Sequence, residues 1–457
     1  MGKAVPGPCP GSLRNNTAGV PPGGKRSPLA REFRIMAGPL LLLTVGSVLP
    51  TELHWYSFHT LVTSTIPDVV YLGHAAFGLA EGHTPYAASF LTPPDQGLPY
   101  FYPPVTLLLS LPPVLAGASY TLGFSIEMLL FAAVGVALVA RSARRLRARP
   151  DVALVIAVLI LAFGPIVSTR VDAIQGLMVA GSALALAGRR QALAVSLVAL
   201  AVLVKETAVL AAVPVALWVL LPDPVSARPP GARLRTLALG LAPAVLVFLV
   251  FIGWSRGGLI TSSLDSLHRA MEIESVPATL VLALSHFMAV RPYAGRLGSL
   301  ELRAADTSAI ALGMSIAGAL FLVLSSWAFA ARHQRPASAM ACAVAIGLSA
   351  TPVLSPQYLL DLAPLVAVAA TLELPRRLAS TLLSLTLLLA LLTQAEFPYL
   401  FPEIARLEPL GIAVLAGRNV ALIAVAGLLA RQAPWSSLRA GMTRLITRRM
   451  ATAGTRV

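Results

Sequence analysis

The run TLALGLAPAVLVFLVFIG, residues 236–253, decides the fold class of this chain. It carries no charged residue, and its length is close to what an α-helix needs to cross the ~30 Å hydrocarbon core of a bilayer. Only helices and closed barrels satisfy every backbone group in lipid. Because the apolar residues are continuous and do not alternate with polar ones, the run predicts a membrane-spanning helix.

Similar runs recur along most of the chain. Of its 457 residues, 56% are hydrophobic and 12% are charged, and the mean hydropathy is +0.77. Soluble domains carry about 25% charged residues. We therefore predict an all-α polytopic integral membrane protein with about twelve transmembrane helices. The expected spans are roughly 35–50, 121–140, 152–168, 176–188, 191–204, 207–221, 236–253, 307–330, 338–353, 357–372, 379–393 and 410–430.

The positive charge gathers in clusters between these spans. A net charge of +15 could indicate nucleic-acid binding, but lysine and arginine also concentrate in the cytoplasmic loops of membrane proteins, and we expect no nucleic-acid partner. Assigning the clusters to the cytoplasm predicts a multi-pass protein of the cell membrane with both termini cytoplasmic. The clusters are Lys25/Arg26/Arg31/Arg34, the arginines of 141–149, Arg189/Arg190, Arg228/Arg233/Arg235, Arg332/Arg335, Arg376/Arg377 and Arg431 through Arg456.

This topology divides the chain into three parts. Residues 1–34 are rich in Gly, Pro and Arg and are expected to form a disordered cytoplasmic tail. Residues 35–430 form the transmembrane domain, with a long first outer loop over 51–103. Residues 431–457 form a basic cytoplasmic tail. The two cysteines, Cys9 and Cys342, indicate neither a disulfide framework nor a metal site.

Two apolar segments, 104–118 and 276–290, leave the number of crossings open. Either segment could span the membrane or re-enter it. Prolines at 103, 104, 112 and 113 leave only a short stretch between them, and proline inside a helix removes a hydrogen bond and clashes with the preceding turn. We therefore expect re-entrant or interfacial segments on the outer side, which are tolerated where they line protein or a wet cavity.

The pair Lys205–Glu206 separates the two short spans 191–204 and 207–221. One tilted helix over the whole stretch would bury an ion pair within the membrane, at a cost of several kcal/mol unless it faces a polar cavity. A helical hairpin would instead put Lys205 near the outer face, and we favour the hairpin.

The outer loops collect the side chains that suit carbohydrate chemistry. Carboxylates and amides bind hydroxyl groups, aromatic rings stack on sugars, and a single carboxylate such as Asp68 can act as a general base. Arginine and lysine bind phosphate. Candidate substrate-binding residues are Tyr71, His74, Tyr86, Tyr102, Asp172, Gln175, His268, Glu274, Gln357 and Tyr358.

Simpler structural roles compete with these assignments. Asp68 follows a proline at the start of an expected helix and could be its N-cap. Arg170 could pair with Asp172 or with lipid phosphate, and Tyr102 could belong to the interfacial aromatic belt. Glu127 lies inside an expected span, where an ionisable residue is a functional candidate.

Three motifs of the first outer loop resemble glycosyltransferase family 87. They are Asp68, the run GHTPY at 82–86, and FYPP at 101–104. The region STRVDAIQG (168–176) through Lys205 is similar to a segment of the wider C-type superfamily. MEIESV (271–276) and SPQYLL (355–360) resemble short patterns of bacterial relatives. The resemblance covers residues 35 to about 370.

This resemblance implies a GT-C-like membrane glycosyltransferase. It would transfer a hexose, with mannose as the family's sugar, from a polyprenyl-phosphate donor to a lipid-linked or glycan acceptor on the outer face with inversion. Asp68 would be the general base, and Arg170, Lys205 and Arg269 would bind the donor phosphate. A single aspartate stands where relatives have a pair, so no metal is expected, and no other cofactor is implied. The sequence 168–176 lacks the clean GQxN or RGN pattern, which leaves the roles of Asp172 and Gln175 less defined.

Two other functions remain open at this stage. A transporter or flippase of an amphiphilic substrate would place ionisable groups in several spans and would often show internal repeats; we find no repeat, and Glu127 is the main candidate within a span. An oligosaccharide ligase or polymerase would carry its large catalytic loop late in the chain, whereas the longest outer loop comes first here.

Overall fold

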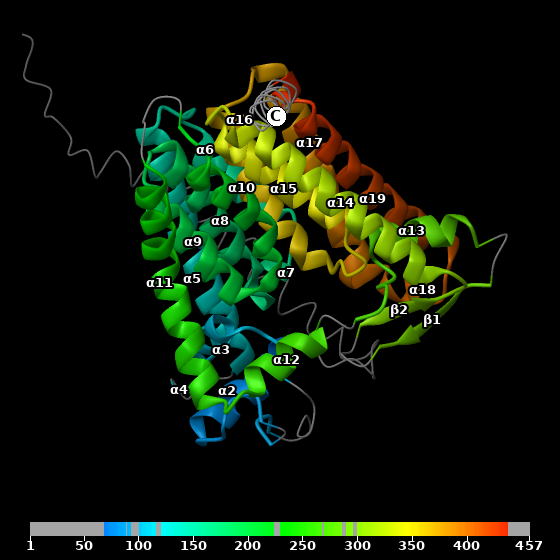
Figure 1. Cartoon of the computed structure of the whole chain (residues 1–457). Helices are drawn as coiled ribbons and strands as arrows, with labels where there is room; N and C mark the ends of the chain where they lie inside the picture. The colour runs from blue at the N-terminus through cyan, green and yellow to red at the C-terminus, as the bar shows by residue number, and fades with distance from the viewer. Residues whose placement is uncertain are drawn as a thin grey trace, which may run out of the picture.

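The computed structural model describes residues 68–87, 89–92, 100–115, 120–223, 229–266, 269–285, 289–295 and 299–436. The expected first span, the N-terminal tail, most of the C-terminal tail and His268 lie outside these residues. The described part is mainly helical (Figure 1), as the fold-class prediction requires.

In the first half of the described chain, all regular secondary-structure elements are helices. Its elements are α2 (Asp68–Ala80), α3 (Pro104–Ser110), α4 (Pro112–Leu115), α5 (Tyr120–Arg145), α6 (Val152–Leu161), α7 (Ile166–Thr169), α8 (Asp172–Ala187), α9 (Gln191–Val204), η1 (Glu206–Ala208), α10 (Val209–Leu220) and α11 (Pro230–Trp254).

The second half contains the one sheet found among the described residues. Its elements are α12 (Gly258–Ser266), α13 (Val276–Ala283), β1 (Arg291–Ala294), β2 (Leu300–Arg303), α14 (Thr307–Ala330), α15 (Pro336–Ala350), η2 (Pro356–Asp361), α16 (Leu362–Leu372), α17 (Arg376–Gln394), η3 (Ala395–Tyr399), α18 (Phe401–Ala405) and α19 (Pro409–Ala430).

Helix length and composition confirm an all-α polytopic membrane protein. Five helices within the described ranges are long and apolar enough to cross a bilayer, and they are α5, α11, α14, the α17 helix continued to Tyr399, and α19. The other expected spans are shorter apolar helices. The predicted span 152–168 is interrupted, because α6 ends at Leu161 and Gly164 has a positive φ of 62° before α7 begins.

The segments containing closely spaced prolines are short, as expected. α3 begins at Pro104 and ends at Ser110, and α4 begins again at Pro112. At 1.5 Å per residue, α3 and α4 together rise only about 18 Å, and α13, with eight residues, rises about 12 Å. These helices are therefore too short to cross the ~30 Å hydrocarbon core.

Lys205 breaks the helix between α9 and α10, as the hairpin interpretation predicted. Its backbone is extended, with φ −156° and ψ 140°. Gln191 at the start of α9 and Trp218 near the end of α10 line the same cavity. The two helices therefore run antiparallel, and Lys205 lies at their turn.

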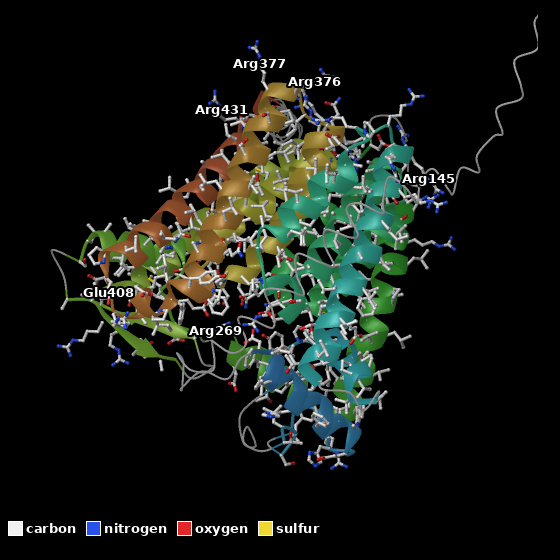
Figure 2. All side chains as sticks on the ribbon, turned by 180° about the vertical axis from the view of Figure 1, so that it is seen from behind. Arg145, Arg269, Arg376, Arg377, Glu408 and Arg431 are labelled. Carbon is white, nitrogen blue, oxygen red and sulfur yellow. The ribbon has the colours of Figure 1, made fainter. Side chains whose placement is uncertain are left out.

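The two ends of the bundle differ in charge. Figure 2 shows Arg145, Arg376, Arg377 and Arg431 at one end, while Arg269 and Glu408 lie well away from it. We call the first end the basic end. Asp172 and Gln175 at the start of α8 lie at the far end of that helix from the basic loop containing Arg189.

The core lies around α8, α15 and α16, whose residues are mostly buried. Close backbone packing brings α8 against η2. A Cβ atom added to Gly176 would lie 2.2 Å from the carbonyl oxygen of Leu360, so only glycine permits this approach. The contact places the start of α8 beside Tyr358 and Asp361.

The sequence analysis did not foresee the small antiparallel hairpin of β1 and β2. Arg291 pairs with Arg303 and Tyr293 pairs with Glu301, and an isolated bridge joins Glu272 to Glu301. Strands of four residues leave almost no periodic signal. The hairpin, α13 and α18 lie beside one another in Figure 1, and the bridge anchors the segment that carries Arg269.

Candidate active site

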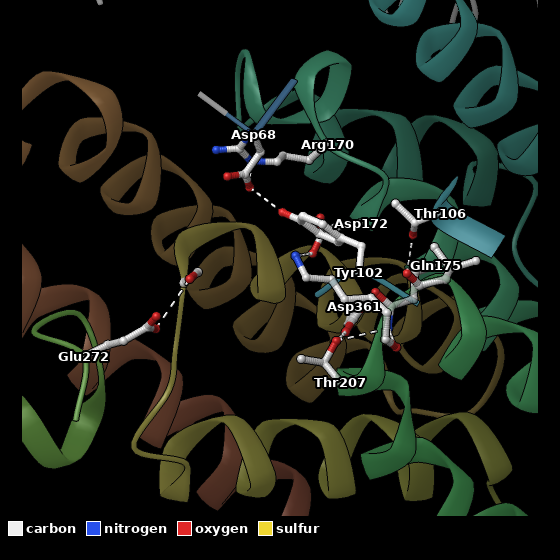
Figure 3. Close-up of polar contacts among 12 residues, drawn as sticks. Asp68, Tyr102, Thr106, Arg170, Asp172, Gln175, Thr207, Glu272 and Asp361 are labelled. Atoms are coloured by element: carbon white, nitrogen blue, oxygen red, sulfur yellow. Dashed lines mark hydrogen bonds and ion pairs between the residues drawn. The ribbon is translucent and has the colours of Figure 1, made fainter. Parts of the chain in front are cut away.

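Asp68 is the first residue of α2, but its carboxylate is directed at tertiary partners. The Tyr102 hydroxyl donates to Oδ2 at 2.7 Å, and Arg170 Nε lies 3.0 Å from the same oxygen. The Asp68 side chain is 27% exposed and that of Arg170 is 12% exposed. Asp68 is thus a solvent-accessible carboxylate with a counter-ion and a hydroxyl donor (Figure 3).

The helix N-terminus that Asp68 occupies also favours negative charge, because helix dipoles are positive at that end. The simpler prediction that Arg170 pairs with Asp172 is wrong. Arg170 pairs with Asp68, and Asp172 pairs with Lys205 at 2.8 Å. Arg170 has an extended backbone after α7, whereas Asp172 is the first residue of α8.

A buried layer of aromatic rings holds Tyr102 in place. Tyr71 stacks on Phe101, with ring centroids 5.1 Å apart, and the Tyr86 hydroxyl donates to the Tyr102 carbonyl oxygen at 2.8 Å. The predicted substrate-binding residues Tyr71 and Tyr86 are therefore buried among these rings, where they support Tyr102. Burial and the nearby Asp68 charge raise the pKa of Tyr102 well above its ordinary value, so its hydroxyl remains a donor at neutral pH.

Lys205 lies one layer deeper. Its Nζ pairs with Asp172, is 5.7 Å from the Tyr102 ring centroid and 4.5 Å from that of Tyr358. Lys205 is 3% exposed and Asp172 is fully buried. The predicted phosphate-binding lysine is thus enclosed by two tyrosines and a carboxylate.

A hydrogen-bond chain fixes the turn that carries Lys205. Gln175 donates through Nε2 to the Lys205 carbonyl oxygen at 2.8 Å and to the Thr207 hydroxyl at 3.0 Å. The Thr207 hydroxyl donates to Asp361 Oδ2 at 2.7 Å. Gln175 and Asp361 therefore position the turn and do not line the accessible part of the site.

Arg269 reaches the same neighbourhood from the segment before α13. It forms an ion pair with Glu272, and it interacts electrostatically with Tyr358 and Glu206. Burial raises the pKa of Glu272 and the Arg269 charge opposes that shift. For Arg269, burial lowers the pKa, but Glu272, Tyr358 and Glu206 together outweigh burial and the net shift is upward.

The structure thus brings together most of the predicted site around two tyrosines. Tyr102 connects Asp68 with Lys205, and Tyr358 connects Lys205 with Arg269. Each of the three predicted phosphate-binding cations already has a carboxylate partner, namely Asp68, Asp172 or Glu272. Glu206, which interacts with Arg269, and Asp361, which accepts from Thr207, add two further acidic groups to the cluster.

Other predicted residues lie elsewhere. His74 lies within α2, and the hydroxyl of Thr92 donates to its carbonyl oxygen. Gln357 is buried in η2 next to Tyr358. Glu274 is buried, and its carboxyl interacts with Glu396, Glu272 and Arg418. His268 lies outside the described residues.

Sequence analysis missed a second ionic cluster. Arg418, in the middle of α19, is fully buried; its Nη1 lies 3.0 Å from Glu396 Oε2, and its Nη2 donates to the Glu274 carbonyl oxygen. Asn419 donates to the Ser275 carbonyl oxygen at 3.2 Å. An arginine within the apolar run GIAVLAGRNVALIAVAG (411–427) was the available signal, because such residues are rare in spans unless they are paired.

The donor set gives no indication of a metal site. Within the described ranges, no group of three His, Cys, Asp or Glu side chains is arranged to hold a metal ion. Asp68, Asp172 and Glu272 each face a cation instead.

Comparisons with known proteins give fold similarity only. No protein-family model matches this chain, and no curated protein sequence matches it. The crystal structure of ArnT from Cupriavidus metallidurans bound to undecaprenyl phosphate aligns with 88% of this chain and 77% of its own, at a TM-score of 0.40 and 15% identity. The oligosaccharyltransferase of Archaeoglobus fulgidus in the apo form aligns with 88% of this chain, at a TM-score of 0.37 and 13% identity. This chain matches 56% of that oligosaccharyltransferase.

Proposed function

We propose that this protein is a membrane glycosyltransferase that moves a hexose from a polyprenyl-phosphate donor to a hydroxyl group of a lipid-linked or glycan acceptor. The observation that carries the proposal is the accessible Asp68 carboxylate beside Arg170. The motifs around Asp68, 82–86 and 101–104, which resemble glycosyltransferase family 87, support the same reading. Mannose as the sugar rests on that resemblance.

In the proposed reaction, Asp68 acts as general base. The acceptor oxygen attacks C1 of the sugar from the face opposite the phosphate, and its proton passes to the Asp68 carboxylate. The bond between C1 and the phosphate oxygen breaks, and its electron pair leaves with the polyprenyl phosphate. Attack from the opposite face inverts the configuration at C1.

The Asp68–Arg170 pair can compensate the changes in charge that occur during this step. The donor phosphodiester carries one negative charge, and the departing phosphate monoester carries two once it is fully ionised. Asp68 loses its charge when it accepts the proton. Arg170 is then released from its partner as the leaving group gains charge, so the same guanidinium can stabilise both ends of the reaction.

The remaining cations have different parts in this proposal. Arg269, with 13% of its side chain exposed, is placed to contact the donor phosphate or the sugar. Lys205 is more deeply buried, and we assign it a longer-range electrostatic role and the positioning of Tyr102 and Tyr358. Tyr102 holds the Asp68 carboxylate in position.

The test is Asp68→Asn in membranes supplied with labelled polyprenyl-phosphate mannose. Loss of a general base typically lowers the rate by about 10²–10⁴-fold, and we expect transfer to fall within that range while the amount of folded protein stays the same. Glu81→Gln is a matched control, since it also removes a carboxylate from the first outer loop, at the other end of α2. Wild-type transfer rates in Asp68→Asn would reject the role of Asp68. Failure of the wild type with this and other polyprenyl-phosphate hexoses would reject the proposed function.

A further inference from the structure

A cavity lies at the basic end of the bundle, away from the Asp68 site. Its volume is about 510 Å³, within the range of small-molecule sites, and its wall includes Arg189, Trp218, His333 and Arg335. These residues come from the loop after α8, from α10 and from the α14–α15 loop. α8 has sixteen residues, so at 1.5 Å per residue the cavity is roughly 24 Å from the Asp172 end of the helix.

Within the described residues, no ion pair joins Arg189, Arg332 or Arg335 of this cavity to a carboxylate, although the charge of Arg335 opposes the rise that burial causes in the pKa of Glu373. Arg332 donates to the Ser436 hydroxyl at 3.1 Å, and Arg335 donates to the Gln432 side-chain oxygen at 3.4 Å. In the same described part of the chain, the Arg189 guanidinium has neither a hydrogen bond nor an ion pair. This contrasts with the Asp68 site, where every cation is paired.

One of the two acids of the cavity wall, Glu373, caps the start of α15. Glu373 accepts the backbone N–H of Ala337 at 2.9 Å and that of Ser338 at 2.8 Å, and it also accepts the Ser338 hydroxyl at 2.7 Å. Its carboxylate is therefore used to satisfy the first turn of α15. Asp223 is the other acid of the wall, so the three arginines exceed the acids in number.

Three residues of the wall adopt a backbone conformation that favours glycine. The φ angles are 58° at Arg189, 48° at His333 and 57° at Arg335. Left-handed conformations of residues with a side chain cost of order 1 kcal/mol and are enriched at functional sites. The positive-inside rule requires basic residues in these loops, but it does not require them at strained positions around one cavity.

His333 adds a further polar group to the wall. Its Nε2 donates to the Trp218 carbonyl oxygen at 3.0 Å, and its Nδ1 is buried without a hydrogen-bond partner in the described structure. Burial lowers the pKa of His333, and the charges of Arg189 and Arg233 lower it further, against the opposing effect of Asp223. An anion in the cavity would offset this positive field and favour the protonated imidazole, whose Nδ1–H could then donate to the anion.

We propose that the cavity at the basic end binds a phosphate group, held by Arg189 and Arg335 beside His333. Guanidinium groups are the side chains best matched to phosphate oxygens. The phosphate could belong to a soluble molecule of the adjacent aqueous phase or to the headgroup of an anionic phospholipid. The site is separate from the proposed transfer reaction and does not depend on it.

The experiment measures binding of two probes to the full chain purified in detergent. Inorganic pyrophosphate, titrated by calorimetry, tests for a soluble phosphate. Phosphatidylglycerol, compared with phosphatidylcholine by native mass spectrometry, tests for a lipid headgroup. Saturable binding of one equivalent of either probe is expected, and the probe that binds identifies the source.

Two double variants with the same change in charge separate the cavity from the general positive surface. Arg189→Gln with Arg335→Gln is expected to weaken binding by about tenfold or more, because hydrogen bonds to charged groups contribute about 1.5–3 kcal/mol each. Arg376→Gln with Arg377→Gln removes two arginines from the same end, outside the cavity, and is expected to bind like the wild type. Equal weakening in both double variants would overturn the proposal, as would the absence of saturable binding of either probe.

Arg189→Gly keeps the test independent of folding. Glycine is favoured at φ 58°, so the melting temperature of this variant is expected to equal or exceed that of the wild type. Binding should nevertheless fall. A variant that melts normally and binds as tightly as the wild type would remove Arg189 from the site and refute the proposal.

Discussion

Two arginine–carboxylate pairs in this protein have nearly the same geometry and opposite surroundings. Arg170 lies 3.0 Å from Asp68, and Arg418 lies 3.0 Å from Glu396. Asp68 is 27% exposed, whereas Arg418 and Glu396 are both fully buried. The first pair lies at the start of α2, and the second joins α19 to the end of α17.

The difference in exposure decides whether each pair can exchange its ion-pair contact for a contact with water or substrate. An accessible carboxylate can give up its guanidinium partner to a phosphate and take a proton from an alcohol, because water or substrate replaces the lost contact. A buried pair has no replacement, and breaking it leaves a charge without compensation. We therefore assign chemistry to Asp68 and Arg170, and fixation of the segment 272–275 to Arg418 and Asn419.

The largest expected effect is on stability, from Arg418→Ala. Removing one partner of a buried pair typically costs about 3–5 kcal/mol, and this change also leaves the Glu274 carbonyl oxygen without its arginine donor. We expect a large drop in melting temperature in detergent and a low yield of folded protein.

A paired replacement controls for this effect. Arg418→Met combined with Glu396→Gln removes both charges, so it should lose less stability than the two single variants added together. Additive losses would mean that the two side chains do not interact, and the comparison of the two pairs would lose its basis.

The next effect is on activity, from Arg170→Gln. The guanidinium beside Asp68 is expected to contribute about 1.5–3 kcal/mol, which corresponds to roughly 10–100-fold in transfer rate. Stability should change little, since pairs near the surface contribute about 0–1 kcal/mol. Initial rates with saturating donor, together with a melting curve, check both expectations. If Arg170→Gln lowers the melting temperature but leaves the transfer rate unchanged, the Asp68–Arg170 pair is structural, like the Arg418–Glu396 pair.

Removing the Tyr102 hydroxyl should have a smaller effect. Tyr102→Phe keeps the ring beside Lys205 and deletes only the 2.7 Å hydrogen bond to Asp68. A hydrogen bond to a charged group contributes about 1.5–3 kcal/mol, but Asp68 keeps Arg170 and is open to water, which replaces part of the lost bond, so the rate should fall roughly two- to tenfold. Tyr86→Phe deletes the hydroxyl that supports the Tyr102 backbone and serves as the comparison. Full activity in Tyr102→Phe would mean that Asp68 does not depend on this donor.

The smallest effect concerns the pH dependence of stability at Glu274. Burial, together with the nearby carboxylates of Glu396 and Glu272, raises its pKa well above the ordinary value of 4.5. The folded state therefore binds this proton more tightly than the unfolded state, and the associated stability is lost as the pH rises above about 4.5 through the raised value. Glu274→Gln should flatten the decline in melting temperature between acidic and neutral pH. An unchanged pH profile would show that Glu274 does not titrate in this range.

Much of the fold was predictable because the bilayer imposes simple length and charge rules. The long apolar runs gave α5, α11, α14, α17 and α19 within a few residues. The charge clusters placed the arginines of one end together, and the break at Lys205 followed from the cost of burying an ion pair. The interruption of 152–168 was missed, because continuous apolar composition does not reveal where a helix bends.

The site was predictable as a set of residue types and not as a set of contacts. Asp68, Arg170, Lys205 and Tyr358 do gather, but the pairing of Arg170 with Asp68 depends on how α2 meets the loop before α8. Tyr71 and Tyr86 could not be told from exposed tyrosines by sequence, because stacking between rings depends on residues far apart in the chain. Arg418 was visible as an ion in an apolar run, yet its partners come from three other segments.

The sequence by itself determined that this chain is a bundle of apolar helices with a basic end and a polar segment carrying a carboxylate, because hydrophobic length and charge distribution are local properties. The tertiary structure alone decided which cation faces which carboxylate, and which of those pairs remains open to solvent. Coulomb interactions and burial depend on distances between helices, and those distances are fixed only when the helices pack, as where Gly176 lets α8 approach η2.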